Sequence, residues 1–112
     1  MKVKTNELDG AALDWAVGSV ATCIPPTEFL RMVLQREYKP TRSWVDCGPI
    51  IERYGISLNP PVFTGGDWVA NINPGSFKDF KMRFAPTPLI AVCRVLVAAN
   101  TGDEVDIPRD FD

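Results

Sequence analysis

The stretch TPLIAVCRVLVAAN, residues 87–100, predicts the central element of the fold. Thr87 suits the N-cap of a helix, Pro88 its first position, and Gly102 follows just past its end. Apolar residues recur at helical spacing and widen to most of the circumference, namely Leu89, Ile90, Val92, Cys93, Val95, Leu96 and Val97. A helix that is apolar nearly all round is buried on several sides. We therefore expect this helix to be the most buried element of the protein.

Working outward, the apolar spacing and the Gly and Pro residues predict three more helices. They are residues 8–22, capped by Asp9, with Leu13 and Val17 facing the central helix; residues 28–37, capped by Thr27; and residues 49–54, opened by Gly48–Pro49 and closed by Gly55. The first of these has the wide apolar stripe that a packed partner of the central helix needs.

A small antiparallel sheet completes the predicted fold. ISLNPPVFTGG reads as an extended piece and a turn, and DWVANI pairs with SFKDFKMRF in a hairpin across residues 73–75. Val105 and Ile107 are expected to add an edge strand before Pro108. The class is α+β, with three to four helices and a short antiparallel β-sheet, in one domain over residues 1–112.

Composition and charge indicate a folded protein and disfavour one class of partner. The apolar share of 46% and the charged share of 23% are those of a folded globular protein. Twelve Lys and Arg stand against fourteen Asp and Glu, a net charge of -2, and the most basic stretch is only residues 31–42. Because nucleic-acid backbones are bound through clustered positive charge, these numbers disfavour duplex nucleic acid as a partner.

The residues of common catalytic and metal sites are missing. The chain has no histidine, which removes the usual general base and the commonest metal ligand. Its three cysteines show no C-x-x-C spacing, so we expect neither a zinc site nor a disulfide, and we place Cys93 in the core. We predict no catalytic residues, no cofactor and no metal. The start lacks an apolar leader and no run is long enough for a membrane span, so we expect a protein of the reducing cytoplasm.

Arg94 interrupts the most apolar helix of the chain. A buried guanidinium needs a partner, so it must reach a carboxylate, the surface or a ligand. The candidate carboxylates are Asp14, Glu52, Asp103 and Glu104.

The stretch SWVDCGPIIERYG, residues 43–55, is the candidate binding site. A helix that starts at Gly48–Pro49 would offer free N–H groups to an anion, and the glycine would let a ligand approach the backbone. Trp and Arg together can hold a flat ring and its negative charge. The predicted ligand-binding residues are Trp44, Asp46, Gly48, Glu52, Arg53, Trp68, Thr87 and Arg94. The competing interpretation is structural: proline at a helix start is ordinary helix chemistry, and Glu52 pairs with Arg94 inside the fold.

Four blocks of sequence occur in an order that resembles a known family. They are GAALDWAV near the start, SWVDCGPIIERYGI, PTPLIAVCRVLVA, and GDEVDIP at the end. Together they resemble the phage NinX-like family, a domain of unknown function carried by many tailed phages and prophages. Residues 22–42 and 73–85 depart from the family pattern. The resemblance implies a phage origin and action in the cytoplasm of the bacterial host, and it supplies no activity.

Two functions follow as expectations. The first is a non-enzymatic phage accessory protein that binds a small anionic or nucleotide-like molecule and sequesters a signal of host defence. The alternative is a protein-interaction module that inhibits or recruits a host or phage protein, through the acidic tail or residues 22–42. A chain this small, with ten Pro and eight Gly, has a limited core, so we also expect a homodimer.

Overall fold

The computed structural model describes residues 2–21, 26–61, 66–72 and 81–111. Within them the chain forms four α-helices, two small antiparallel sheets and a final 3-10 turn. In chain order these are β1 (Lys2–Lys4), α1 (Gly10–Ala21), α2 (Pro26–Leu34), α3 (Trp44–Tyr54), β2 (Ile56–Asn59), β3 (Trp68–Ile72), β4 (Lys81–Ala85), α4 (Pro88–Thr101), β5 (Glu104–Asp106) and η2 (Arg109–Phe111). The predicted α+β class is confirmed.

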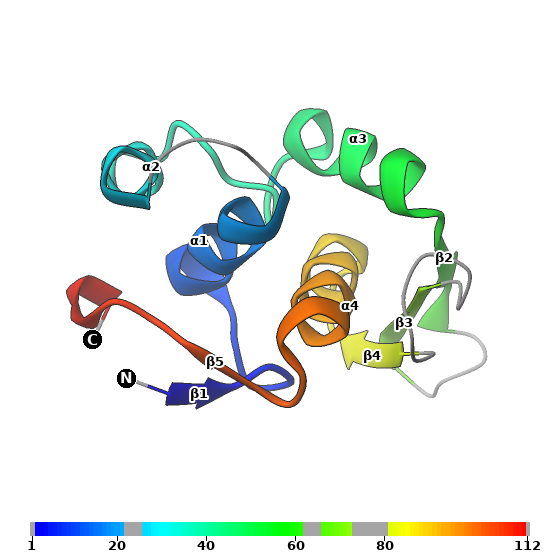
Figure 1. Ribbon diagram of the computed structural model, residues 1–112. Helices are drawn as coiled ribbons and strands as arrows, with labels where there is room; N and C mark the ends of the chain where they lie inside the picture. Colours follow the sequence, from blue (N-terminus) through cyan, green and yellow to red (C-terminus); the bar gives the residue numbers. More distant parts are fainter. Residues whose placement is uncertain (1, 22–25, 62–65, 73–80, 112) are drawn as a thin grey trace.

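α4 lies at the centre, with α1 on one side of it, the three-stranded sheet on the other and α3 above (Figure 1). The Thr87 hydroxyl accepts a hydrogen bond from the Ile90 N–H at 3.2 Å, and Gly102 follows the helix with a φ of 86°. α4 holds eight buried residues, more than any other described element. Its prediction from the sequence, including the cap and the end, is confirmed.

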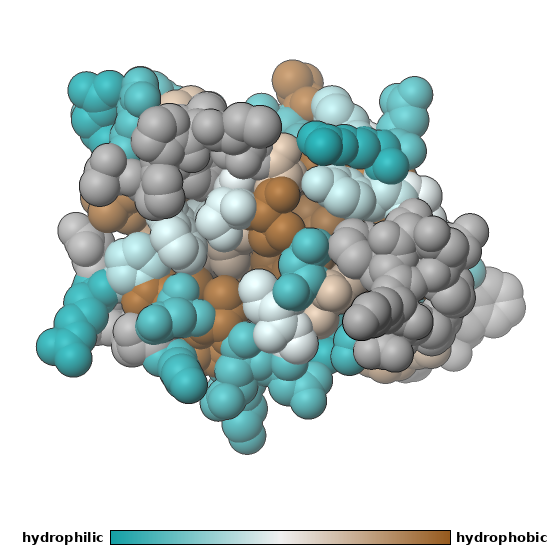
Figure 2. Space-filling view, in the orientation of Figure 1, coloured by the Kyte–Doolittle hydropathy of each residue, from teal (hydrophilic) through white to brown (hydrophobic). Residues whose placement is uncertain are grey.

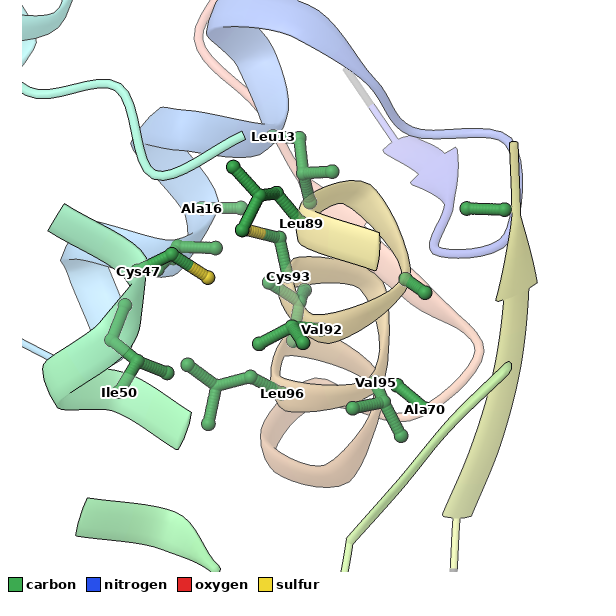
Figure 3. Packing of buried hydrophobic residues seen from close by; sticks show 14 of the residues in the cluster. Leu13, Ala16, Cys47, Ile50, Ala70, Leu89, Val92, Cys93, Val95 and Leu96 are labelled. Carbon is green, nitrogen blue, oxygen red and sulfur yellow. The ribbon is translucent and has the colours of Figure 1, made fainter. Parts of the chain in front are cut away.

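The core is built around the two sides of α4. Figure 3 shows Cys47 of α3 facing the apolar stripe of α4, while Val95 on the other side lies beside Ala70 of β3. Leu13 and Val17 of α1 are fully buried against α4. The predicted packing of the first helix on the central one is therefore confirmed.

The main sheet has the order β2–β3–β4, with antiparallel neighbours. Trp68 lies opposite Ala85 and Ile72 opposite Lys81, which confirms the pairing of DWVANI with the strand that precedes α4. The predicted turn at residues 73–75 lies outside the described residues. One face of the sheet packs against α4, and Ile72 and Ala85 on that face are therefore buried in the core cluster.

The predicted edge strand exists, but its partner was not foreseen. β5 pairs antiparallel with β1, with Val3 opposite Val105, in a separate two-stranded sheet. Ile107 follows the strand and is buried. Residues 2–4 give too short a pattern for a strand prediction, and the pairing joins segments about one hundred residues apart.

α3 corrects the prediction that matters most for the site. The helix begins at Trp44, not at Pro49, and Pro49 lies inside it. Ser43 caps it: the hydroxyl accepts from the Asp46 N–H at 3.4 Å, and the Ser43 carbonyl accepts from the Cys47 N–H at 2.9 Å. An interior proline costs about 3 kcal/mol, and this cap and the burial of Cys47 against α4 act in the opposite direction. No helix start lies at Gly48–Pro49.

α2 also has different ends from those predicted. It begins at Pro26, so Thr27 lies within the helix and is not its cap, and it ends at Leu34 instead of residue 37. The chain leaves the helix because Arg36 has a φ of 62°, which is the left-handed region. The closing of α3 by Gly55, with φ 62° and ψ 42°, is as predicted.

Candidate functional site

The predicted site residues on α3 lie on two different flanks of the helix. At 3.6 residues per turn, Trp44, Gly48 and Glu52 follow one another along one flank. Asp46 and Arg53 lie on the other, where both line a surface hollow of about 290 Å³. We call this the α3 hollow; its lining residues are Ala21, Tyr38, Val45, Asp46, Pro49, Ile50, Arg53 and Tyr54. The structure thus brings two of the eight predicted residues together in one cavity.

The remaining three predicted residues lie in other parts of the fold. Trp68 is half-buried in β3 and packs against the core. The Thr87 hydroxyl is occupied as the cap of α4. Arg94 donates from Nε to the Leu8 carbonyl at 2.8 Å and from Nη1 to the Phe84 carbonyl at 3.0 Å. These contacts are structural.

Two of the four carboxylates considered for Arg94 have other partners. Asp14 accepts from the Thr41 N–H, and Asp103 pairs with Arg83 at 3.2 Å. Arg94 instead ties the loop before α1 and the end of β4 to α4, because its two acceptors come from those segments. The Arg94 guanidinium therefore has two backbone carbonyls as its partners, whereas the sequence analysis considered a carboxylate, the surface or a ligand.

Polar and aromatic groups share the α3 hollow. Arg53 Nη1 donates to the Ala21 carbonyl at 3.3 Å, and its guanidinium carbon lies 5.3 Å from the centre of the Tyr54 ring. The Asp46 carboxylate accepts from the Lys39 N–H at 3.0 Å. Burial, with smaller effects of nearby acidic groups, raises the pKa of Tyr38 well above its usual value, so its hydroxyl stays protonated. Figure 2 shows apolar atoms at the surface between α1 and α3, where this hollow lies, with hydrophilic atoms around them.

A second hollow, of about 400 Å³, was not predicted. Its lining residues are Asp9, Gly10, Ala11, Arg36, Thr41, Arg42 and Ile90, and we call it the α1 hollow. The connector between α2 and α3 forms a wall of both hollows, since Tyr38 lines one and Thr41 the other. Arg36 and Arg42 belong to the basic stretch over residues 31–42, but no spacing in the sequence links this stretch to the start of α1.

A third hollow, of about 340 Å³, lies along the β1–β5 ladder. Asp103, Glu104 and Asp106 line it together with Lys2, Thr101 and Val105. The Asp103 side chain is 88% exposed, as expected for a solvated acidic tail. With three carboxylates and one ammonium group in its lining, this hollow has a net negative charge and repels anions. It therefore does not suit the predicted anionic ligand.

Asp14 is a buried carboxylate beside the α1 hollow. It is 2% exposed, and its Oδ1 accepts from the Thr41 N–H at 2.8 Å. Burial raises its pKa above the ordinary 3.8, while the Thr41 N–H, the nearby Thr41 hydroxyl and the Arg42 charge act in the opposite direction. The hydroxyl lies near this carboxyl but makes no hydrogen bond of acceptable geometry. Asp14 therefore holds the connector in place at the cost of a buried charge.

The Asp14 contact gives a prediction for stability against pH. Asp14→Ala is expected to lower the free energy of unfolding by about 1 kcal/mol at pH 7, because the buried Thr41 N–H loses its acceptor while the buried charge is also removed. Asp14→Asn keeps an acceptor and removes the charge, so it should be at least as stable as the parent protein.

The sign of the pH effect follows from the raised pKa. The contribution of Asp14 is fully present below pH 3.8, and it is lost as the pH rises through the native pKa. Urea unfolding from pH 3.5 to pH 8 should therefore show the parent protein losing stability relative to Asp14→Asn as the pH rises. A constant difference across that range would contradict the assignment.

The described residues offer no metal or membrane element. They contain no group of three or more acidic or cysteine side chains that could hold a metal ion. In the same part of the chain, no helix is long and apolar enough to cross a membrane. Cys47 and Cys93 are buried free thiols, and burial chiefly raises the pKa of Cys93, which confirms its predicted place in the core.

Four helices, two small antiparallel sheets and open surface hollows define the described chain as a small α+β domain. The chain belongs to the phage family described as Bacteriophage P22, NinX, whose model matches residues 4–100. All lining residues of the α3 and α1 hollows fall within the matched range. The block GDEVDIP, which contributed to the resemblance, lies beyond it. A comparison with curated proteins found no match.

Proposed function

We propose that the protein is a non-enzymatic phage accessory protein that binds a small anionic or nucleotide-like molecule in the α3 hollow. The observation that carries this proposal is the lining of the hollow, which combines Tyr38 and Tyr54 with the guanidinium of Arg53. Aromatic walls suit a flat ring, and the guanidinium suits its negative charge. Asp46 would accept a hydrogen bond from an amino or hydroxyl group of the same molecule. A volume of about 290 Å³ lies at the lower end of small-molecule pockets and favours a small ligand.

The biological role that we propose is sequestration of a host-defence signal in the bacterial cytoplasm. Membership of a phage family supports this setting, because phage genes are expressed in infected bacteria. A sequence without histidine supports binding over acid–base catalysis. A binder that performs no chemistry acts by lowering the free concentration of its ligand.

Arg53→Gln tests the proposal at its charged residue. Protein is incubated with a small-molecule extract of phage-infected cells and desalted, and the retained molecules are measured by mass spectrometry. Loss of a charge-assisted hydrogen bond should reduce retention at least about tenfold. Arg31→Gln is the matched control, because Arg31 is exposed on α2 and lines neither hollow. Equal retention by the two variants would reject the α3 hollow as the site.

One observation favours the alternative function, a protein-interaction module for a host or phage protein or for a second copy of the chain. Trp44 is 57% exposed and Val45 is 84% exposed at the start of α3. Exposed aromatic residues are enriched where proteins bind one another. Trp44→Ala separates the two proposals. If the variant loses a dimer mass in light scattering, or no longer captures a partner protein, while ligand retention is unchanged, the interaction module is favoured. If the variant loses activity in an infection assay only to the extent that its thermal stability falls, Trp44 has a structural role.

A further inference from the structure

Asp46 and Arg53 form the two charged ends of one stripe along α3. They are about two helical turns apart on the same flank of the helix, which is a rise of about 10.5 Å between their Cα atoms. Pro49 and Ile50 occupy the turn between them, and all four residues line the α3 hollow. The stripe therefore offers a carboxylate, an apolar middle and a guanidinium, in that order.

Each charged group is held by a different segment of the chain. The Asp46 Oδ2 atom accepts from the Lys39 N–H of the connector at 3.0 Å. The Arg53 guanidinium donates to the carbonyl of Ala21, the last residue of α1, at 3.3 Å and lies 5.3 Å from the centre of the Tyr54 ring. These contacts use only part of each group, because a carboxylate has further acceptor sites and a guanidinium has further N–H donors. Both ends can therefore bind a ligand while they keep these contacts.

The separation of the two ends decides which kind of ligand fits. The ammonium and the carboxylate of an α-amino acid sit on one carbon atom, so such a zwitterion is short compared with the stripe. A nucleoside 5′-monophosphate has its base and its phosphate on opposite sides of the sugar, which matches the order of groups on α3. The base would lie against the apolar middle and Tyr38, and the phosphate would accept from Arg53. A volume of about 290 Å³ suits a mononucleotide better than a larger nucleotide.

The carboxylate decides which base fits. Guanine places an amino group beside a ring N–H, so two parallel donors meet the two oxygens of one carboxylate. Adenine and cytosine place the amino group beside a ring nitrogen that only accepts, and uracil places carbonyl oxygens on both sides of its N–H. In each of these bases an acceptor would face the second oxygen of Asp46. We propose that the α3 hollow binds a guanine nucleotide with a single phosphate group, an inference that rests on the proposed function and names the ligand class of the same site.

Titration calorimetry with guanosine, inosine and adenosine 5′-monophosphates at equal ionic strength tests this proposal. The guanine nucleotide should bind most tightly. The inosine nucleotide, which lacks only the amino group, should bind about tenfold more weakly, and the adenine nucleotide should be weaker still. Arg53→Gln should weaken all three about tenfold, because each has the same phosphate.

Asp46→Asn tests the base contact separately from the fold. The asparagine keeps an oxygen for the Lys39 N–H and replaces the other oxygen with an amide donor. The variant should bind the guanine nucleotide about tenfold more weakly and should lose most of its preference over the adenine nucleotide, because an amide matches the adjacent donor and acceptor of adenine. A purely structural role of Asp46 would weaken all three nucleotides equally. Glu28→Gln is the matched control, because Glu28 is exposed on α2 and lines none of the three hollows.

The outcomes separate this inference from the proposed function. If the guanine nucleotide gives no heat of binding, if the three nucleotides bind equally well, or if Asp46→Asn weakens all of them equally, the guanine assignment is wrong. The proposed function still stands in that case if the protein retains an acidic molecule from infected cells and Arg53→Gln loses it. If the protein neither binds the guanine nucleotide nor retains such a molecule, both proposals are wrong.

Discussion

Leu96→Ala is expected to lower the free energy of unfolding by about 3 kcal/mol, the largest effect among the single changes considered. Leu96 is fully buried in the middle of α4, where α1, α3 and the main sheet all pack. Removing three carbons there loses their transfer free energy and leaves a cavity that helices on one side and a sheet on the other cannot close. Thermal unfolding should shift down by about 10 °C or more in a domain of this size.

Leu34→Ala is the matched control for this prediction. Leu34 ends α2 and is 48% exposed, so the same chemical change there should cost no more than about 0.5 kcal/mol. Urea unfolding of the two variants side by side measures the difference. Similar losses for both variants would mean that α4 is not the centre of the core.

The second large effect is expected at Arg94. Arg94→Met keeps most of the aliphatic length and removes both charge-assisted hydrogen bonds, to the Leu8 and Phe84 carbonyls. We expect a loss of about 2 kcal/mol in the free energy of unfolding. Amide exchange should rise in β4 and in the loop before α1, because these are the two segments that Arg94 holds to α4.

Arg94→Lys tests the geometry of the contact and not only its charge. A lysine ammonium is a point donor without the planar fork of guanidinium, so it cannot bond both carbonyls in the same way. Its stability should lie between those of the parent protein and Arg94→Met. If both variants keep full stability while ligand retention falls, Arg94 belongs to a binding site, which is the interpretation that its contacts disfavour.

The elements that the sequence predicts correctly are those whose signals are local. α4 carries its cap, its first-turn proline and its end within sixteen residues, and its buried apolar residues recur at helical spacing between them. The pairing of β3 with β4 follows from alternation in two neighbouring segments. In α3 two local signals compete: Pro49 predicts a helix start at residue 49, whereas the Ser43 cap and the burial of Cys47 extend the helix over the proline.

The candidate site was harder to predict because its residues meet only in the folded chain. The α1 hollow joins the start of α1, the connector around Thr41 and Ile90 of α4, which are far apart in the sequence. No spacing pattern links them. In the α3 hollow, Asp46 and Arg53 could be predicted from one short stretch of sequence. The role of Tyr38 could not, because this residue belongs to the connector, which meets α3 only in the folded chain. The pairing of β1 with β5 was not predicted for the same reason, because the two strands are about one hundred residues apart in the sequence.

Native mass spectrometry of the protein purified from phage-infected cells tests the central claim, that this member of the NinX family binds a small anionic molecule, most directly. We predict a species that is heavier than the bare chain by the mass of one small molecule, and negative-ion fragmentation should identify this molecule as acidic. The Arg53→Gln variant should lack the heavier species, and the Arg31→Gln variant should keep it. The bare chain alone, or a stoichiometric complex with another protein and no small molecule, would contradict the claim.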